Sequence, residues 1–531
     1  MKCIISVFTL LLSINLIAQD QTDSSRVIYA WELQNFYSTP IEVNIDTNLP
    51  NFQVIYPIYT YSINNSFLGN FGSAVIQNNF TDRIFVNDAF FLNPYLPYLS
   101  TSDNTKFFNT KKPFSRLTYT NSGPSRNREE SFEIFHTQNT STKLNFGFRY
   151  HAISAKGQYR YLQVKRHAFR IFGSYTGSKY MLHTAFNLNR YRAGESAGIN
   201  DSIFRNKSYD YIKEYPSVFE GTGQPKYESN AENRIRYYDF LLSQRLKLFT
   251  LSAKIDSTNP DKGGTFAEPI ITYALKINRT TKTYDDIDPV GPGFYNVTYF
   301  NKQYTLDSIT HFKLSNTLQL EFKTVLRGKV QTSIYGMIGY DYETYSFVSD
   351  WDTNYFADTT IAHTPYVPEN GDTLKGVNRR DYINNTYISA GIYGNFWNRV
   401  KARFFATVYV AGQKFGNTKF GGIFNSNLPI FGREYEFDVS GTIENKIPGY
   451  LLNNYYSNHY IWEQDILPEY RMHLSSKLGA PSNKFELRGN YYFIRNYIYF
   501  NNQAVPENYR HYEKIFIEHF RAHVFFTTYF I

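Results

Sequence analysis

Hydrophobic and polar residues alternate with a period of two along much of the chain. The alternation is clearest in residues 143–152, 400–410, 434–441 and 484–493. In residues 400–410 every second residue is apolar, and the residues between them include Lys401 and Arg403. A period of two is typical of a β-strand whose two faces meet different environments. The segments have about ten residues, where strands of soluble proteins usually have five or six, and about ten tilted residues cross a bilayer as a strand.

Further segments repeat this pattern and are expected to be strands, with boundaries good to a few residues. They are residues 114–120, 130–138, 167–176, 181–189, 234–243, 246–255, 269–277, 310–322, 329–340, 386–396 and 515–530. Allowing for weaker segments, we expect roughly 14 to 18 strands, which lies within the range of bacterial membrane barrels. The predicted fold is all-β: a transmembrane, antiparallel, up-and-down β-barrel.

The connections between these strands differ in length. Residues 139–142 and 177–179 are short, whereas residues 191–233, 281–306, 343–384 and 445–470 are long and rich in Asn, Asp, Gly, Pro and Tyr. Short turns at one end and long loops at the other are typical of outer-membrane barrels. Residues 20–112 alternate less cleanly. We expect them to form a periplasmic or lumenal segment before the barrel of residues 113–531, or to hold one or two extra strands.

The first residues have the layout of a secretory signal. Lys2 supplies a positive charge, residues 4–17 are mostly apolar, and Ala18 and Gln19 precede Asp20. This pattern predicts a signal peptide over residues 1–19, cleaved after Ala18 or Gln19. The alternative is a buried N-terminal strand or helix. A lipoprotein is disfavoured because a lipidated cysteine follows the apolar core of the signal, whereas Cys3 precedes it.

Composition supports the barrel and excludes several other classes. The chain has 48 Tyr and 46 Phe, which suit strands and the aromatic girdles of a membrane barrel. After the N-terminus, no run of 18 apolar residues suggests a helical membrane span. The only cysteine is Cys3, so no disulfide is expected in the exported chain. The net charge of +9 is spread along the chain without a basic block, which argues against nucleic-acid binding and allows a mild preference for anionic solutes or lipid headgroups.

Motifs of catalysis or cofactor binding are missing from the sequence. No phosphate loop, zinc-protease helix, nucleophile elbow or EF-hand loop is found. Asp285, Asp286 and Asp288 form an acidic cluster that could bind calcium, but an ordinary turn explains them better. Glu434, Glu436 and Asp438 share one strand face, where a charged lumen wall is a better explanation than a catalytic pair. We therefore expect no enzyme activity, no metal and no cofactor.

Several short motifs resemble the putative porin family of Bacteroidetes. Residues 66–73 (SFLGNFGS) are similar to an N-terminal motif of that family, and residues 111–119 (KKPFSRLTY) are similar to its "PF…L.Y" segment. The strand ending at Gln138 and Asn139 and the loop motif at residues 198–201 also match, over a span from about residue 60 to 505. The resemblance implies an outer-membrane barrel with passive solute diffusion and names no substrate. Members of that family tend to continue past the segment that matches residues 496–506, so the resemblance leaves closure of the barrel open, with a shortened paralogue as one alternative.

These observations predict a porin of the cell outer membrane. Small polar solutes would diffuse through a lumen of mixed charge and weak selectivity. The candidate residues of its wall are Lys143, Arg149, Lys401, Arg403, Glu436, Asp438 and Arg488. Outer-membrane lipid, lipopolysaccharide and the barrel-assembly machinery are the expected partners, and the oligomeric state stays open. The alternatives are a non-conducting barrel that binds a surface partner through its long loops, an outer-membrane hydrolase, and a soluble β-sandwich lectin.

Overall fold

The fold was analysed on a computed structural model. It describes residues 28–34, 38–43, 45, 56–83, 88–125, 127–157, 162–195, 231–252, 266–286, 295, 297–301, 304–326, 330–349, 377–396, 400–430, 433–479, 485–509 and 515–524. The predicted signal peptide lies outside these residues, and so does Asp288.

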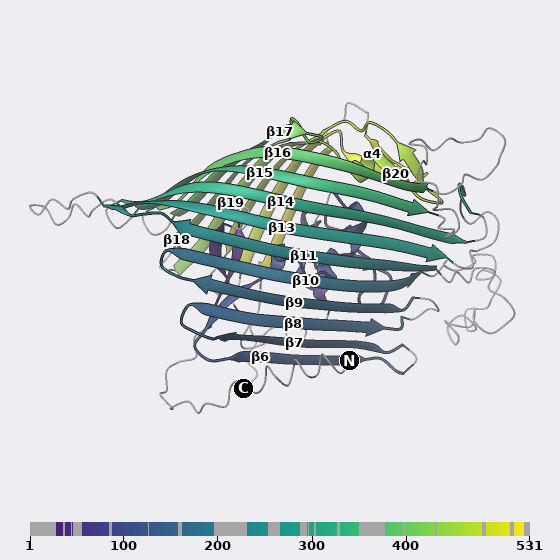
Figure 1. Ribbon diagram of the computed structural model, residues 1–531, viewed down its shortest axis with the longest axis horizontal. Helices are drawn as coiled ribbons and strands as arrows, with labels where there is room; N and C mark the ends of the chain where they lie inside the picture. Colours follow the sequence, from purple (N-terminus) through teal and green to yellow (C-terminus); the bar gives the residue numbers. More distant parts are fainter. Residues whose placement is uncertain are drawn as a thin grey trace, which may run out of the picture.

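One antiparallel sheet curls into a barrel (Figure 1). Its order follows the chain and returns from the last strand to the first, as in an up-and-down barrel. The wall strands are β6 (Phe114–Ser122), β7 (Glu129–Asn139), β8 (Leu144–Ala155), β9 (Val164–Thr176), β10 (Tyr180–Glu195), β11 (Ala231–Lys247), β12 (Leu251–Ser252), β13 (Phe266–Asp286), β14 (Thr305–Leu326), β15 (Val330–Ser349), β16 (Val377–Phe396), β17 (Val400–Gly412), β18 (Thr418–Ile430), β19 (Arg433–Lys446), β22 (Glu469–Gly479), β23 (Phe485–Arg495) and β26 (Ile515–Val524). Since β12 has only two residues, 16 long strands make up the wall in the described part of the chain.

Apolar side chains project outward from the wall all around the described barrel. Large examples come from strands far apart in the sequence: Leu117, Ile171, Phe186, Leu318, Phe322, Ile334, Ile338, Ile392, Phe404, Phe420, Phe424, Ile443 and Leu474 are exposed. The alternate side chains of the same strands face inward, among them Lys313 and Thr317. Exposed apolar side chains in such numbers belong in lipid rather than in water. The predicted fold class is therefore confirmed.

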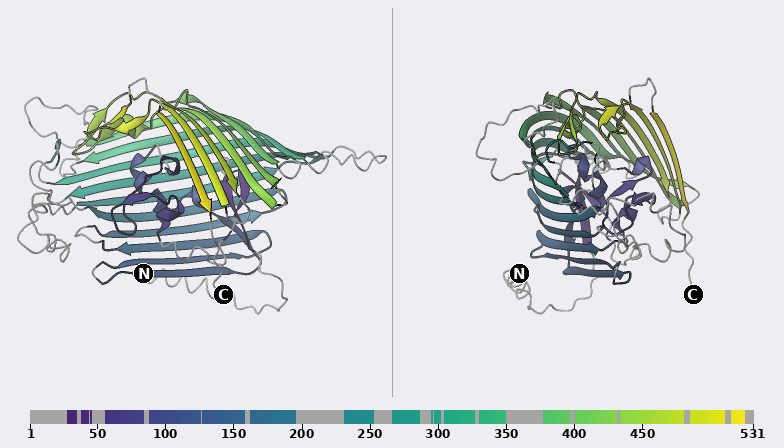
Figure 2. Two further views of the ribbon diagram at one scale, coloured as in Figure 1. Left: turned by 180° about the vertical axis from the view of Figure 1, so that it is seen from behind. Right: turned by 90° about the vertical axis from the view of Figure 1, so that its right-hand side faces the viewer.

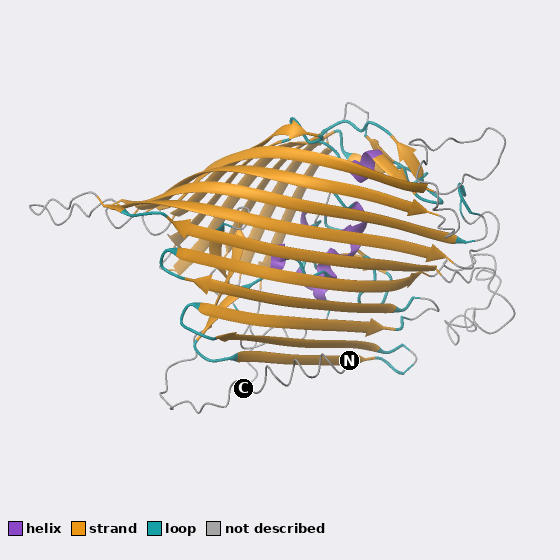
Figure 3. Cartoon of the chain, viewed as in Figure 1, coloured by secondary structure: helices purple, strands orange, loops and turns teal. Residues whose placement is uncertain are grey.

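The two ends of the barrel differ as expected. Short turns join β7 to β8 and β9 to β10 at one end of the barrel. The strand ends that precede and follow the long connections β10–β11, β13–β14, β15–β16 and β19–β22 are at the other end (Figure 3). Four neighbouring strands, β13 to β16, have 20 to 22 residues. The wall strands that follow them, β17, β18, β19, β22, β23 and β26, have 10 to 14. Since about ten residues cross the bilayer, one side of the barrel extends beyond the membrane at the long-loop end.

The sequence missed two strands and misplaced a third. β18 and β22 were not expected, because β18 contains two successive glycines and a proline and β22 begins inside a predicted loop. Residues 246–255 were expected to be a separate strand. Instead, Leu246 and Lys247 end β11, and only Leu251 and Ser252 of the remaining described residues pair with β13.

Aromatic rings lie over glycines of neighbouring strands on the inner face of the wall. A Cβ atom on Gly339 would approach the ring of Tyr387 to 2.0 Å, and one on Gly421 would approach Phe405 to 2.3 Å. Gly147 with Phe172 and Gly391 with Tyr335 repeat the arrangement. Glycine inside a strand often marks such a close approach. Gly421, one of the two successive glycines of β18, therefore makes room for the lumenal ring of Phe405.

The N-terminal segment lies inside the barrel (Figure 2). We call its described part, within residues 28–110, the plug. It contains a three-stranded sheet of β1 (Ile28–Gln34), β2 (Thr39–Val43) and β5 (Phe107–Thr110), a hairpin of β3 (Asn65–Phe67) and β4 (Val75–Gln77), and the 3-10 helices η1 (Pro57–Thr60), η2 (Phe80–Asp82), η3 (Phe90–Tyr98) and η4 (Ser102–Asn104).

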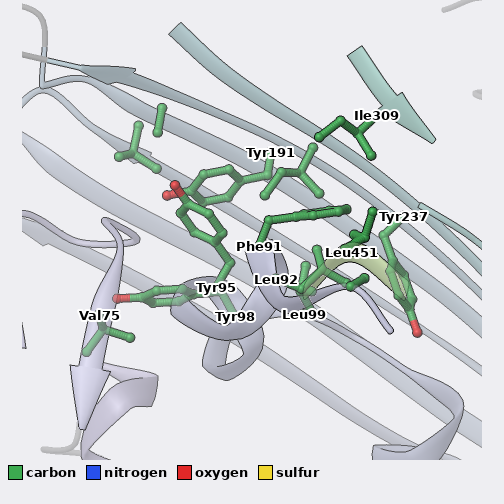
Figure 4. Packing of buried hydrophobic residues seen from close by; sticks show 14 of the residues in the cluster. Val75, Phe91, Leu92, Tyr95, Tyr98, Leu99, Tyr191, Tyr237, Ile309 and Leu451 are labelled. Carbon is green, nitrogen blue, oxygen red and sulfur yellow. The ribbon is translucent and has the colours of Figure 1, made fainter. Parts of the chain in front are cut away.

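Apolar side chains of the plug pack against inward side chains of the wall. Figure 4 shows Tyr95, Phe91 and Leu92 of the plug beside Tyr191, Tyr237 and Ile309 of the wall. A second, separate cluster joins Phe107 and Phe108 of β5 to Phe135, Phe172 and Leu241 of the wall. Burying these side chains supplies the hydrophobic free energy that holds the plug in place.

The connection between β19 and β22 covers part of the plug. It contains α4 (Tyr450–Asn453), β20 (Asn454–Tyr456) and β21 (Ile461–Glu463). Tyr450 stacks on Tyr345 of β15, and Tyr455 lies 6.1 Å from Phe90 of the plug, ring centre to ring centre. In the next connection, which holds β24 (Ile498–Phe500) and β25 (Pro506–Asn508), Phe500 lies 5.4 Å from Phe90. The loops therefore close over the plug at the long-loop end.

Candidate functional site

A network of ion pairs joins the plug to the wall. Asp88 of the plug lies 3.1 Å from the Nζ atom of Lys313 on β14 and 2.9 Å from that of Lys414, in the turn after β17. The same two ammonium groups bind Glu343 of β15, at 3.2 and 2.9 Å. Lys313 also binds Asp341, at 3.1 Å. We call these five residues the latch.

Burial makes the latch electrostatically strong. The side chains of Glu343 and Asp341 are 1 % and 5 % exposed, so water screens their attraction to the lysines weakly. The hydroxyl of Tyr345 donates a further hydrogen bond of 3.0 Å to Glu343, and His311 lies 3.3 Å from the same carboxylate. One Oδ1 atom of Asp341 is buried without a hydrogen-bond partner among the described residues.

The helix η4 is held by wall residues of β9 to β11. The backbone N–H of Ser102 donates to Asp239 at 2.6 Å, and its hydroxyl donates to the same carboxylate. Ser100 exchanges two hydrogen bonds with Asn189, of 2.9 and 2.8 Å. Arg170 donates to the carbonyl oxygens of Thr101 and Asn104, both at 3.0 Å. Buried polar groups on both sides are thereby satisfied, which fixes the plug at a defined depth.

Two cavities of mixed polar and apolar lining lie beside the latch. The larger, of about 540 Å³, is bordered by plug residues such as Asp88 and Asn104 and by wall residues from β11 to β17, including Lys276 and Tyr387. The smaller, of about 360 Å³, lies toward β17 to β19. Asp88, Lys313 and Tyr409 border both cavities. The latch therefore stands between the two spaces.

A third cavity, of about 230 Å³, lies between the plug and β6 to β9. Four cationic side chains border it: Lys106, Arg116, Arg149 and Arg170. Glu133 of β7 lies 2.8 Å from Arg116 and 2.5 Å from Arg149. Most of the other lining residues are phenylalanines: Phe108, Phe114, Phe135 and Phe172.

The structure places the predicted wall residues at different positions. Arg149 faces the lumen on β8 and borders the third cavity. Arg403 faces the lumen on β17, where it donates to Gln34 of the plug at 3.1 Å and lies over the ring of Tyr393. Lys401 is exposed and lies on the same strand two residues earlier. Lys143 lies in the turn before β8 and is exposed there, outside the strand.

The other three predicted residues come together near the short-turn end. Lys477 of β22 lies 3.5 Å from Glu436, 3.8 Å from Asp438 and 3.8 Å from Glu486. Arg488 of β23 is 2.6 Å from Glu486. These charges pair with one another along adjacent strands. The side chain of Glu434 lies outside the described part.

Two residues of the predicted acidic turn, Asp285 and Asp286, belong to a strand, and Asp288 lies outside the described residues. Asp285 and Asp286 end β13, because the strand extends past residue 277, where the sequence pattern stops. Asp285 is 2.6 Å from Arg234, and Asp286 accepts a hydrogen bond of 2.7 Å from Tyr295. Among the described residues no group of three or more His, Cys, Asp or Glu side chains could hold a metal ion.

Sequence reasoning missed the latch. Lys313 lies on the polar side of the predicted strand 310–322, so extending the alternation rule to that strand would have found it. Asp88 and Lys414 carried no such signal. Asp88 belongs to a segment without periodicity. Lys414 lies in the turn between β17 and β18, and the sequence did not predict this turn because it did not predict β18.

Comparisons with known proteins were made for both sequence and structure. None of the curated proteins compared with the chain matches it significantly. Among solved structures, it is similar to the RagAB peptide transporter (10 % identity, 69 % of this chain and 44 % of that one, TM-score 0.39). It is also similar to the siderophore receptor PirA from Pseudomonas aeruginosa (8 %, 78 % and 64 %, 0.41) and to a mutant ferric enterobactin receptor, PfeA, from the same species (11 %, 77 % and 59 %, 0.46). The chain covers less than two thirds of each of these proteins.

No helix in the described ranges is both long and apolar enough to traverse a bilayer. A family model described as "Putative porin" matches residues 27–526. That match includes the plug and all the wall strands described above. The chain belongs to this family of outer-membrane porins.

Proposed function

We propose that the protein admits small polar solutes by passive diffusion through the barrel, along the cavities between the plug and the wall. The observation that carries this proposal is the pair of cavities of about 540 and 360 Å³ on either side of the latch. Besides apolar side chains, both are bordered by hydroxyl, amide and charged side chains of inward-facing wall residues. Such a surface replaces part of the hydration shell of a polar solute.

The latch is the proposed constriction of this route. Asp88, Lys313 and Tyr409 border both cavities, so a solute that moves from one to the other passes these side chains. Opposite charges at the same place give weak selectivity for charge, because attraction to one group is offset by repulsion from another. Export through a cleaved signal peptide over residues 1–19 is part of the same proposal.

Conductance in planar bilayers tests the function. We expect the purified, folded protein to form channels in salt solutions, with a single-channel conductance that rises when Asp88→Ala shortens the side chain at the constriction. The matched control is Asp465→Asn, which removes one carboxylate from an exposed loop residue. A folded barrel without any conductance over a range of salt concentrations would overturn the proposal and favour a non-conducting, surface-binding barrel.

A further inference from the structure

The third cavity has an excess of positive charge: Arg170 is buried, Arg116 and Arg149 are partly buried, and Lys106 is exposed. Lys106, Arg116, Arg149 and Arg170 border it, and in the described part of the chain Glu133 is the one carboxylate that pairs with any of them. Asp239 stands two strands away from Arg170 in the same cross-strand row, and it accepts hydrogen bonds from Ser102 and Tyr237 rather than from the cations of the cavity. Buried charges in proteins are normally paired, because removing an unpaired charge from water is costly.

The hydrogen bonds of Arg170 all go to neutral acceptors, so no carboxylate of the described residues contacts its guanidinium directly, and Asp239 and Glu133 attract it only at longer range. Its guanidinium donates to Asn187 at 2.6 Å and to the backbone oxygens of Thr101 and Asn104, which are all neutral acceptors. The residue is 6 % exposed, so bulk water supplies little compensation. On Arg116, the Nε atom is buried without a hydrogen-bond partner among the described residues. A donor that points to no described acceptor is a place for an acceptor from a ligand.

The shape and lining of the cavity favour a small anion. Its volume of about 230 Å³ suits a group of a few heavy atoms. Guanidinium groups present paired donors that match the oxygens of a carboxylate or a phosphate. The phenylalanine side chains lower the local dielectric constant, which strengthens the attraction between the cations and an anion.

We propose that this cavity is a binding site for a small oxyanion, held by Arg116 and Arg149 from the wall with Lys106 and Arg170 contributing positive potential. Glu133 occupies part of the same donor set and so competes with the ligand. The site binds its anion whether or not solutes cross the barrel. Equilibrium binding therefore tests it separately from the conductance that tests the proposed function.

Titration calorimetry on the detergent-solubilised, folded protein is the experiment, with sodium butyrate and sodium phosphate as separate probes in a chloride background. We expect saturable binding of one or both probes. Arg149→Gln and Arg116→Gln should each weaken it about tenfold, the size of one lost charge-assisted hydrogen bond. Arg149→Lys should retain more of the affinity than Arg149→Gln, because it keeps the charge. Lys179→Gln removes a positive charge from an exposed turn and should leave binding unchanged.

Glu133→Gln distinguishes a ligand site from a purely structural cluster. If the cavity binds an oxyanion, losing the competing carboxylate should tighten binding about tenfold, because two guanidinium groups become available. If the arginines serve only the fold, the same change should destabilise the barrel and create no affinity. Absence of saturable binding for both probes, or equal weakening by Lys179→Gln, would overturn the proposal.

Discussion

The ammonium group of Lys414 lies 2.9 Å from the carboxylate of Asp88, although 326 positions separate the two residues in the chain. Asp88 belongs to the plug, and Lys414 to the turn that joins β17 to β18. Lys414 therefore contacts the plug from the side of the barrel that has the shorter strands. Lys313 reaches the same carboxylate from β14, among the long strands. The plug is therefore held between the two unequal halves of the wall.

Replacing Lys414 by Met should loosen the plug. The change leaves Asp88 and Glu343 with Lys313 as their one remaining lysine in the described network, and breaking a buried charge pair by removing one partner costs about 3 kcal/mol. We expect faster cleavage of the plug by an added protease, while heat-modified mobility on gels still shows a folded barrel. Lys419→Met on β18, whose side chain is half exposed beside Glu444, is the control. Equal protection of the plug in both variants would contradict a latch at Asp88.

The latch should withstand mild acid. Burial raises the pKa of Asp88, but Lys313 and Lys414 lower it by more, so the pKa of this carboxyl lies well below its ordinary value. A group whose pKa is lower in the folded state stabilises at every pH above its unfolded pKa, which is about 4. That stabilisation disappears only as the pH falls through the lower folded value. Protease protection of the plug should therefore be the same at pH 8 and pH 5.

Histidine provides the control for this pH prediction, because His311 lies beside Glu343 within the same network. Loss of protease protection between pH 8 and pH 5 in both the natural protein and His311→Gln would contradict a charged Asp88 that is stable to acid.

Gly339→Val should impair folding of the barrel. A side chain at this position would collide with the ring of Tyr387, which lies 2.0 Å from the place where a Cβ atom would stand. Moving the ring would also break its contact with Thr317, at 3.2 Å. Overpacking of this kind typically costs about 1 to 3 kcal/mol. Gly336→Val on the same strand meets no atom within 4 Å and is the matched control. The urea midpoint of unfolding in detergent measures both, and equal midpoints would refute the packing argument.

Ile334→Arg tests the lipid-facing belt. Ile334 is exposed on the outer face of β15, next to Phe322 of β14. An arginine in the hydrocarbon region of a barrel costs about 2 to 4 kcal/mol near its centre. Folding into lipid vesicles, followed as a function of urea, should show this loss. Leu467→Arg, in an exposed loop residue, should change stability by less than about 0.5 kcal/mol. An equal effect at both positions would contradict a membrane-facing Ile334.

The sequence was informative where one physical rule acts on many residues. Alternation revealed most of the wall, because every membrane-facing strand must present apolar side chains on one side. It underestimated the length of β13 to β16, which have 20 to 22 residues where about ten cross a bilayer. It missed β18, where Gly421 replaces an inward side chain and accommodates the ring of Phe405.

The interior of the barrel was much less predictable. Its contacts join single residues from the plug to single residues of distant strands, as Trp31 does when it donates to His183 at 3.0 Å. Such pairs have no period and no fixed spacing, so one sequence gives no signal for them. Arg149 was identified because it lies on an alternating strand. Asp88 was not, because its role comes only from the three-dimensional position of its segment.

The direct passage from the plug into β6 has a consequence for biogenesis. Only Lys111, Lys112 and Pro113 separate β5 from the first wall strand, so the plug emerges from synthesis before any part of the wall exists. In the sheet order β26 lies beside β6, so the described wall strands form a ring around a segment that precedes them in the chain. A segment enclosed in this way and tethered to β6 can leave only along the barrel axis, past the inward side chains of the wall.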